Sequence, residues 1–155
     1  MALNKKKVID QLNRILECEL AGVVRYTHYS MMIFGYNRIP IVSWFRAEAA
    51  ESLQHAQQAG EMVTRLGGHP SLAIGSLLET HEHDIGQILR ETLQAEHTAL
   101  GLYLQLLKLV AGKSVALEEY ARGLIAQEEA HIDEIDKMLR KPGETEISKE
   151  ARDLD

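Results

Sequence analysis

Apolar residues recur every three or four positions over four long stretches of the chain, and short breaks separate the stretches. In an α-helix this spacing places the apolar side chains on one face, where they pack against neighbouring helices. The pattern predicts four long helices, over residues 4–34, 42–66, 84–111 and 115–140. Most of the sequence is Leu, Ala, Glu, Gln and Lys, which favours helix over sheet. We therefore expect an all-α protein.

The breaks between the predicted helices differ in length. Gly35 and Pro40 mark a short first connection, because both residue types end helices, while the second connection covers residues 70–83. Antiparallel neighbours need only a short link, so the long one predicts a crossover that leaves the second and third helices parallel. Residues 1–140 are expected to form one four-helix domain, and the polar residues 141–155 a tail that is mobile or forms a short helix.

Composition and charge restrict where this domain is found and what it binds. The chain has 155 residues, enough for one core, and no apolar run near the length of a membrane span. The N-terminus lacks the apolar segment of a secretory signal, and the single cysteine, Cys18, forms no internal disulfide, so we expect a cytoplasmic protein. The net charge is −6 and the basic residues are dispersed, which argues against nucleic-acid binding.

Acidic residues interrupt the apolar faces of all four predicted helices. A buried carboxylate costs several kcal/mol unless it is compensated. The first and third helices each carry one such Glu, and the second and fourth each carry a Glu and a His on one side. Inward-facing sets of this kind build dinuclear metal sites in four-helix bundles, where two divalent cations balance four carboxylates. The candidate ligands are Glu19, Glu51, His55, Glu96, Glu128 and His131.

The chemistry of the ligands and their spacing refine this site. Oxygen and imidazole ligands without thiolate suit iron, with manganese as the alternative. Glu128 is preferred to Glu129 because it lies three residues before His131 and continues the apolar stripe. Glu48 lies two helical turns before His55, which we interpret as too far to reach the same metal.

Two further histidines, His81 and His83, lie in the predicted crossover with acidic residues on either side. They either contact a metal at the surface or are solvated side chains without a site, and the second interpretation is the simpler one. The position of His28 in the first helix suggests no functional role.

Several segments together resemble bacterioferritin, over about residues 5 to 139. These segments are Val8 to Leu16, Glu19-Leu20, Tyr26, Glu51 to Ala56, Leu66 to Pro70, Leu89-Arg90 through Glu96, and Glu128 to Asp133. The resemblance implies a ferritin-like four-helix bundle that acts as a ferroxidase. Such a protein would bind two iron ions, oxidise Fe(II) with dioxygen or hydrogen peroxide, and pass Fe(III) to a mineral store inside a shell. By the same resemblance, Tyr26 is a near neighbour of the metals.

One departure from bacterioferritin concerns a metal ligand. The family carries a Glu three residues before the histidine of the second helix, and this chain has Ser52 there. Three alternatives remain: Glu51, four residues before His55, ligates instead; the site lacks this ligand; or Ser52 or water fills the position. A weakened site would suit a non-catalytic subunit of a mixed shell.

Two other departures concern haem and assembly. Bacterioferritins hold haem between two subunits with a Met from each, and Leu53 occupies that position here, so haem is not expected. The tail offers few apolar residues for the fifth helix of a large shell. We expect a homo-oligomer, at least a dimer, with a shell as the larger alternative.

Other proteins on the same bundle give rival interpretations. A rubrerythrin-like peroxidase or oxidase normally carries a rubredoxin-type domain, which needs paired cysteines, and Cys18 alone excludes that domain from this chain. A hydroxylase would need a substrate channel and a reductase partner. A DNA-shielding mini-ferritin conflicts with the acidic charge balance.

Overall fold

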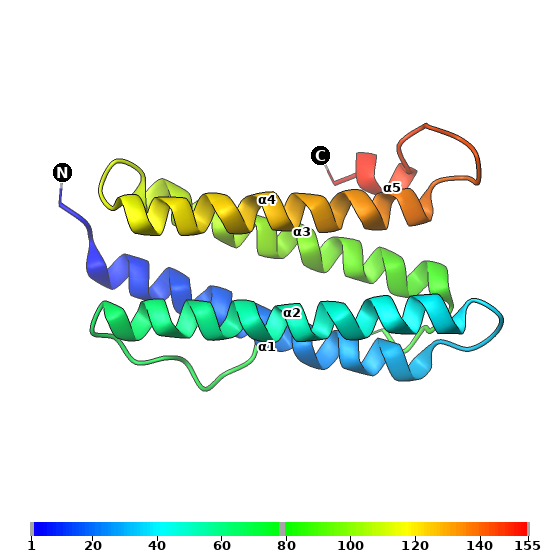
Figure 1. The fold of residues 1–155 in the computed structure, drawn as a ribbon, viewed down its shortest axis with the longest axis horizontal. Coiled ribbons are helices and arrows are strands. Elements are labelled where there is room, and N and C mark those ends of the chain that lie inside the picture. Colours follow the sequence, from blue (N-terminus) through cyan, green and yellow to red (C-terminus); the bar gives the residue numbers. More distant parts are fainter. Residues whose placement is uncertain (1, 78–79, 155) are drawn as a thin grey trace.

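The computed structural model describes residues 2–77 and 80–154, so Met1 of the predicted domain and Asp155 of the predicted tail lie outside the described residues. Within them the chain forms four long helices and one short one (Figure 1): α1 Lys5–Met32, α2 Arg38–Arg65, α3 Ile85–Val110, α4 Val115–Leu139 and α5 Lys149–Arg152. The crossover returns along the bundle, so α2 and α3 run in the same direction (Figure 1). The predicted four-helix bundle with a long second connection is confirmed.

Side-chain caps fix where three of the long helices begin. Asn4 accepts a hydrogen bond from the backbone N–H of Lys7 at 3.1 Å, and Asp84 does the same for Gln87 at 3.0 Å. Ser114 caps α4 in the same way. Each cap satisfies a backbone N–H that has no partner within its own helix.

The second helix begins at Arg38, four residues earlier than predicted. Pro40 therefore lies in the first turn of α2 and not in the connection before it. The first backbone N–H groups of a helix have no intrahelical partner, so proline loses nothing there. Arg38 also donates from Nη1 to the carbonyl oxygen of Ile33 at 2.6 Å, which holds the turn between α1 and α2.

The hydrophobic core consists of two clusters with a polar layer between them. One cluster includes Leu12 and Tyr103, and the other includes Phe45 and Ile135. Each long helix carries one glutamate of the polar layer: Glu19, Glu48, Glu96 or Glu128. Along each helix, the buried residues of one cluster come before this glutamate and those of the other cluster come after it. The buried polar residues of this layer are Glu19, Glu48, Ser52, His55, Glu96 and Glu128. All four long helices thus contribute to one polar layer near the middle of the bundle.

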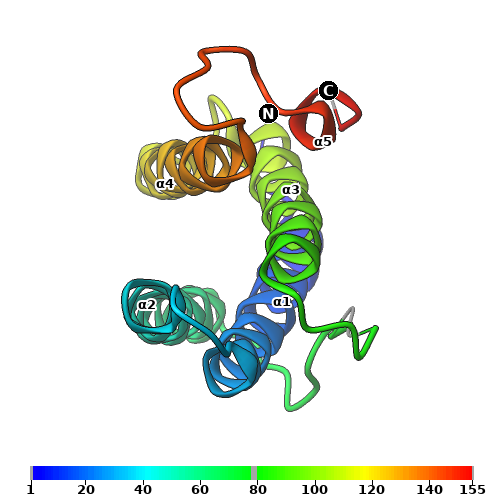
Figure 2. The ribbon, with the colours of Figure 1, turned by 90° about the vertical axis from the view of Figure 1, so that its right-hand side faces the viewer.

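The view along the bundle shows α1 and α3 on one side and α2 and α4 on the other, with the crossover beside α1 (Figure 2). The crossover is tied to α1 by hydrogen bonds, from the backbone N–H of Ser71 to Asn13 Oδ1 at 2.9 Å and from that of Gly75 to the carbonyl oxygen of Glu17 at 2.8 Å. In the described part of the chain, no helix is both long and apolar enough to cross a membrane.

The tail contains the short helix α5, which packs against α4. Asp136 of α4 is buried, and it accepts hydrogen bonds from the backbone N–H of Ser148 at 2.8 Å and from Arg140 at 2.7 and 2.9 Å. Ala151 is buried on the same side. A polar anchor with a small apolar contact therefore docks the tail, although its sequence offers few apolar residues.

Candidate metal centre

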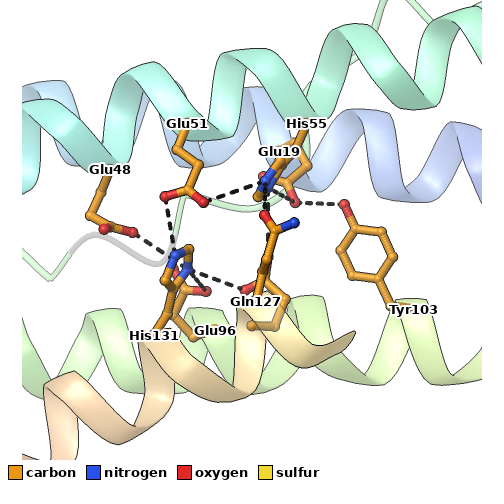
Figure 3. Close-up of polar contacts among 9 residues, drawn as sticks. Glu19, Glu48, Glu51, His55, Glu96, Tyr103, Gln127 and His131 are labelled. Carbon is orange, nitrogen blue, oxygen red and sulfur yellow. Dashed lines mark hydrogen bonds and ion pairs between the residues drawn. The ribbon is translucent and has the colours of Figure 1, made fainter. Parts of the chain in front are cut away.

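All six predicted ligands lie together in the polar layer, and each long helix contributes at least one. Figure 3 shows the carboxylates and imidazoles from opposite helices pointing toward one another. Together with Glu48, which was not predicted, their ligand atoms form three groups, each within 4.8 Å: Glu19, His55 and Glu128; Glu96, Glu128 and His131; and Glu48, Glu51 and His131. Two of the groups share Glu128, and two share His131.

Glu128 lies between the two histidines. Its Oε1 atom is 3.9 Å from His55 Nδ1, and its Oε2 atom is 3.9 Å from His131 Nδ1. The side chain is almost fully buried, while the neighbouring Glu129 is exposed. The three-residue spacing to His131 keeps both side chains on the inner face of α4. One carboxylate thus presents one oxygen to each side of the centre.

A further carboxylate completes each side. Glu19 Oε1 lies 3.5 Å from His55 Nδ1, and Glu96 Oε2 lies 3.6 Å from His131 Nδ1. Two ligand atoms bound to one ion at about 2.1 Å lie roughly 3.0 to 3.5 Å apart, depending on the coordination geometry. The observed separations are close to this range, so the side chains need to move little for a cation to bind on either side of Glu128.

Glu48 was expected to be too far along α2 to share a metal with His55, and the structure places it beside His131 instead. Glu48 is buried, and its Oε2 atom lies 3.4 Å from His131 Nδ1. The expectation considered only the distance along α2 to His55. The relevant partner is a histidine of α4, which faces the earlier turn of α2 where Glu48 lies.

Glu51 contacts the opposite edge of the two imidazole rings. Its Oε2 atom is 3.1 Å from His131 Nε2, and its Oε1 atom is 3.6 Å from His55 Nε2. His55 Nε2 also lies 2.9 Å from the side-chain oxygen of Gln127. Glu51 Oε2 and the Gln127 oxygen lie within hydrogen-bond distance of these nitrogens, so the network favours the proton of each neutral ring on Nε2 and leaves Nδ1 to face the inner carboxylates.

Ser52 packs where α1 and α2 approach closely. A Cβ atom built on Gly22 would lie only 3.0 Å from Ser52 Oγ. Ser52 also borders a small cavity of about 10 Å³ together with Glu19, Glu96 and Glu128. The glycine on α1 and the short side chain on α2 permit this close approach beside the carboxylates.

The charges of the cluster are unbalanced without a cation. Burial, and then the charge of Glu96, raise the pKa of Glu128 well above its usual range. Burial alone would lower the pKa of His131, but the hydrogen bond and charge of Glu96, with the charges of Glu48 and Glu51, raise it to about 9.

The buried Glu128 Oε2 atom has no hydrogen-bond partner among the described residues. In the metal-free protein, the raised pKa values of His55, His131 and Glu128 favour bound protons, which offset part of the buried negative charge. Divalent cations can replace these protons, because the donor set already matches them in type and spacing. The residues therefore fit two cations.

Two tyrosines lie close to the carboxylates. Tyr26, predicted as a neighbour of the metals, is buried against Phe45 with ring centroids 5.9 Å apart and borders the same small cavity. Tyr103 donates from its hydroxyl to Glu19 Oε1 at 2.8 Å. Burial, and then the charge of Glu19, raise the pKa of Tyr103, so the hydroxyl keeps its proton as a donor.

Sequence reasoning missed three contacts of the centre: Glu48, Gln127 and Tyr103. Tyr103 carried a signal, since it follows Glu96 by two helical turns on the same face of α3. Gln127 carried none, because it only precedes Glu128 on α4 and reaches His55 across the bundle.

The sequence and the fold also resemble known proteins. Residues 9–143 match the family model for the ferritin-like domain. The bacterioferritin of Mycobacterium bovis is 30% identical over 142 residues, which cover 85% of this chain and 83% of that protein.

Two solved structures share the fold. A ferritin-like, diiron-carboxylate protein from Bacillus anthracis superposes with a TM-score of 0.84 at 25% identity, covering 90% of this chain and all of the other. The dodecameric thioferritin of Bacteroides fragilis, a bacterioferritin-related protein, gives a TM-score of 0.81 at 24% identity, over 88% of this chain and 86% of that one. The chain therefore belongs to the ferritin-like family, as a member of the bacterioferritin type.

Proposed function

We propose that the chain is an iron-storage or iron-detoxification protein of the bacterioferritin type and acts as a ferroxidase. Its substrate is Fe(II), two ions of which bind in the polar layer of the bundle. The oxidant is dioxygen or hydrogen peroxide, and the product Fe(III) passes to a mineral store. Membership of the ferritin-like family and the diiron-carboxylate relative from Bacillus anthracis support this proposal.

The position of Glu128 carries the proposal. Each of its oxygens faces a different histidine at 3.9 Å, with a further carboxylate beside each histidine. In this assignment Glu128 bridges two iron ions. Glu19 and His55 complete the ligands of one ion, while Glu96, His131 and Glu48 complete those of the other.

Glu51 has a different role in this assignment. Because it contacts Nε2 of both histidines, it orients the rings and keeps Nδ1 available for iron. Glu48 then supplies from α2 the carboxylate that Ser52 lacks. The sequence alone left open a weakened site, as in a non-catalytic subunit, because Ser52 replaces the usual Glu. With Glu48 as a ligand the site is not weakened in this way, which favours a catalytic subunit.

The residues of the chain also control protons during oxidation. Two Fe(II) ions release two electrons, which reduce one dioxygen to hydrogen peroxide or one hydrogen peroxide to two waters, and either reduction consumes two protons. The protons that leave Glu128 and the histidines when iron binds lie close to where they are consumed. Tyr103 holds Glu19 in place and keeps its own proton.

Residues outside the carboxylate centre bear on oligomerisation and on haem binding. We propose a homo-oligomer, consistent with the dodecameric relative, and with the exposed apolar side chains of Phe34 and Ile39 at the turn between α1 and α2. Leu53 is a poor iron ligand and lies at the place where a bacterioferritin would carry its haem methionine. We therefore expect no haem absorbance from bis-methionine ligation at this position.

Aerobic addition of Fe(II), followed by stopped-flow absorbance of the ferric product, tests the activity. We expect oxidation well above the rate in buffer, a return to the buffer rate for Glu128→Ala, and wild-type oxidation for Glu129→Ala. Glu129 is a matched control because it is the adjacent glutamate and is exposed. A wild-type rate equal to that in buffer would refute the ferroxidase and leave only a metal-binding protein.

A further inference from the structure

A group of histidines lies on the outer side of α1, away from the carboxylate centre. The crossover follows α1 and is held to it at its beginning through Ser71 and Gly75. At its other end, just before the Asp84 cap of α3, His83 meets His28 of α1 (Figure 2 shows the crossover beside α1). None of these histidines belongs to the three groups of the carboxylate centre.

The two imidazoles face each other through the same ring nitrogen. His28 Nε2 and His83 Nε2 are 3.3 Å apart, and the ring centroids are 5.4 Å apart with the rings inclined by 63°. Two nitrogens bound to one tetrahedral zinc ion at about 2.0 to 2.1 Å lie roughly 3.3 to 3.4 Å apart. The observed separation matches that of two imidazoles on a shared metal ion, and it also falls within hydrogen-bond distance.

A third histidine stands beside this pair. The ring centroid of His81 is 6.3 Å from that of His83. His81 has φ of +61°, and among the described residues it is the one non-glycine residue with a positive φ. Such a backbone conformation is strained for a residue that carries a side chain, and it persists where the surroundings require it. It places a third imidazole beside that of His83.

Space for a bound ion and its water lies beside His28. His28 and His81 line a hollow of about 320 Å³ together with Val24, Arg25 and Leu77. The hollow opens to solvent, so a cation could enter without passing through the bundle. Glu82 and Asp84 flank His83 in the sequence.

We propose that His28 and His83 form a second metal site for a late-transition divalent cation such as Zn²⁺. Among the described residues, no ligand nitrogen of His81 joins this pair within 4.8 Å, so water completes the coordination. Imidazole ligands suit zinc, copper, nickel and cobalt and not the hard cations that prefer oxygen. The ion fastens the end of the crossover to α1. The simpler alternative is one hydrogen bond between a protonated and an unprotonated Nε2, which needs no metal.

Counting bound zinc distinguishes these two alternatives. The protein is freed of metal, equilibrated with Zn²⁺ and examined by native mass spectrometry. We expect His28→Ala and His83→Ala each to bind one zinc ion per chain fewer than the wild type. His69→Ala is the matched control, because His69 is exposed at the start of the crossover and outside the histidine group, and it should bind as much zinc as the wild type.

The carboxylate centre is expected to take zinc as well, so the count is repeated on a Glu128→Ala background. His28→Ala should again remove one ion there, and Fe(II) oxidation by the single His28→Ala variant should equal that of the wild type. That equality shows that the variant is folded and that the two sites are separate. Equal zinc counts for the wild type, His28→Ala and His83→Ala would overturn the proposal, whatever the result for the ferroxidase.

Discussion

His131 is contacted on both of its ring nitrogens, and the two contacts have different consequences. Glu48 faces Nδ1 at 3.4 Å, on the side of the inner carboxylates, while Glu51 faces Nε2 at 3.1 Å. We predict that Glu48→Ala removes one divalent ion per chain from the centre. Glu51→Ala should keep both ions but weaken their binding about 10-fold to 100-fold, the usual effect of losing a carboxylate behind a metal-bound histidine.

Anaerobic titration with Co²⁺, read by its visible absorbance, measures both stoichiometry and affinity. Glu61→Ala serves as the control, since Glu61 is an exposed residue of the same helix. If Glu51→Ala lost an ion and Glu48→Ala kept both, Glu51 would be the ligand that the sequence suggested, and our assignment of Glu48 would be wrong.

Tyr103 offers a second test at the level of a single side chain. Replacing it by Phe removes the hydrogen bond to Glu19 Oε1 and leaves a buried carboxylate oxygen without its donor. We predict a loss of about 1 to 3 kcal/mol in the free energy of unfolding of the metal-free protein. Urea unfolding measures the change, with Tyr36→Phe as the control because Tyr36 is fully exposed. Equal losses for both variants would exclude a specific role for Tyr103.

The sequence identified single residues well where they break a local pattern. Glu19, Glu96 and Glu128 each interrupt an apolar stripe, so helical periodicity alone predicted that they face inward, and all three are buried. Glu48 and Gln127 make their contacts across the bundle, to a histidine on another helix. Such contacts depend on how the helices are set against each other, which periodicity does not determine.

Among the elements, the short helix α5 depends on one buried carboxylate. Burial alone would raise the pKa of Asp136, but hydrogen bonds from Ser148 and Arg140 lower it below its usual range. We predict that Asp136→Ala frees the tail and lowers the free energy of unfolding by about 1.5 to 3 kcal/mol, as for other hydrogen bonds to a charged group. Urea unfolding and amide exchange of residues 146–152 measure the two effects.

The same carboxylate predicts a pH dependence with a definite sign. Because its folded pKa is lowered, its contribution is complete above the ordinary Asp value of about 3.9 and is lost as the pH falls through the lower folded value. The stability difference between wild type and Asp136→Ala should therefore shrink only in acid. Asp133→Ala, an exposed neighbour on α4, should stay within about 0.5 kcal/mol of the wild type. A difference that persists in strong acid would contradict this origin.

Helix periodicity predicted the four long elements, and the ends that it missed have local causes. α2 begins early because Pro40 is compatible with a first helical turn, while the sequence pattern treated it as a break. The docking of the tail rests on backbone-to-carboxylate contacts of Asp136, and these leave no hydrophobic pattern in residues 141–154.

At the scale of the whole molecule, the two apolar clusters hold the four helices at both ends, while the layer between them carries the buried charge. Packing on both sides fixes the polar layer, so the carboxylates remain close even though each carries a desolvation cost. We interpret this arrangement as a bundle stabilised by its apolar ends and completed by two cations at its middle.

The most direct test of this account is a crystal structure of the protein soaked with Mn²⁺ or Fe(II), read from anomalous scattering. The account predicts two peaks in the polar layer, one beside His55 Nδ1 and one beside His131 Nδ1, with Glu128 between them. It also predicts Glu48 within bonding distance of the second peak. Anomalous peaks confined to the surface, with Glu19, Glu96 and Glu128 unbound, would contradict it.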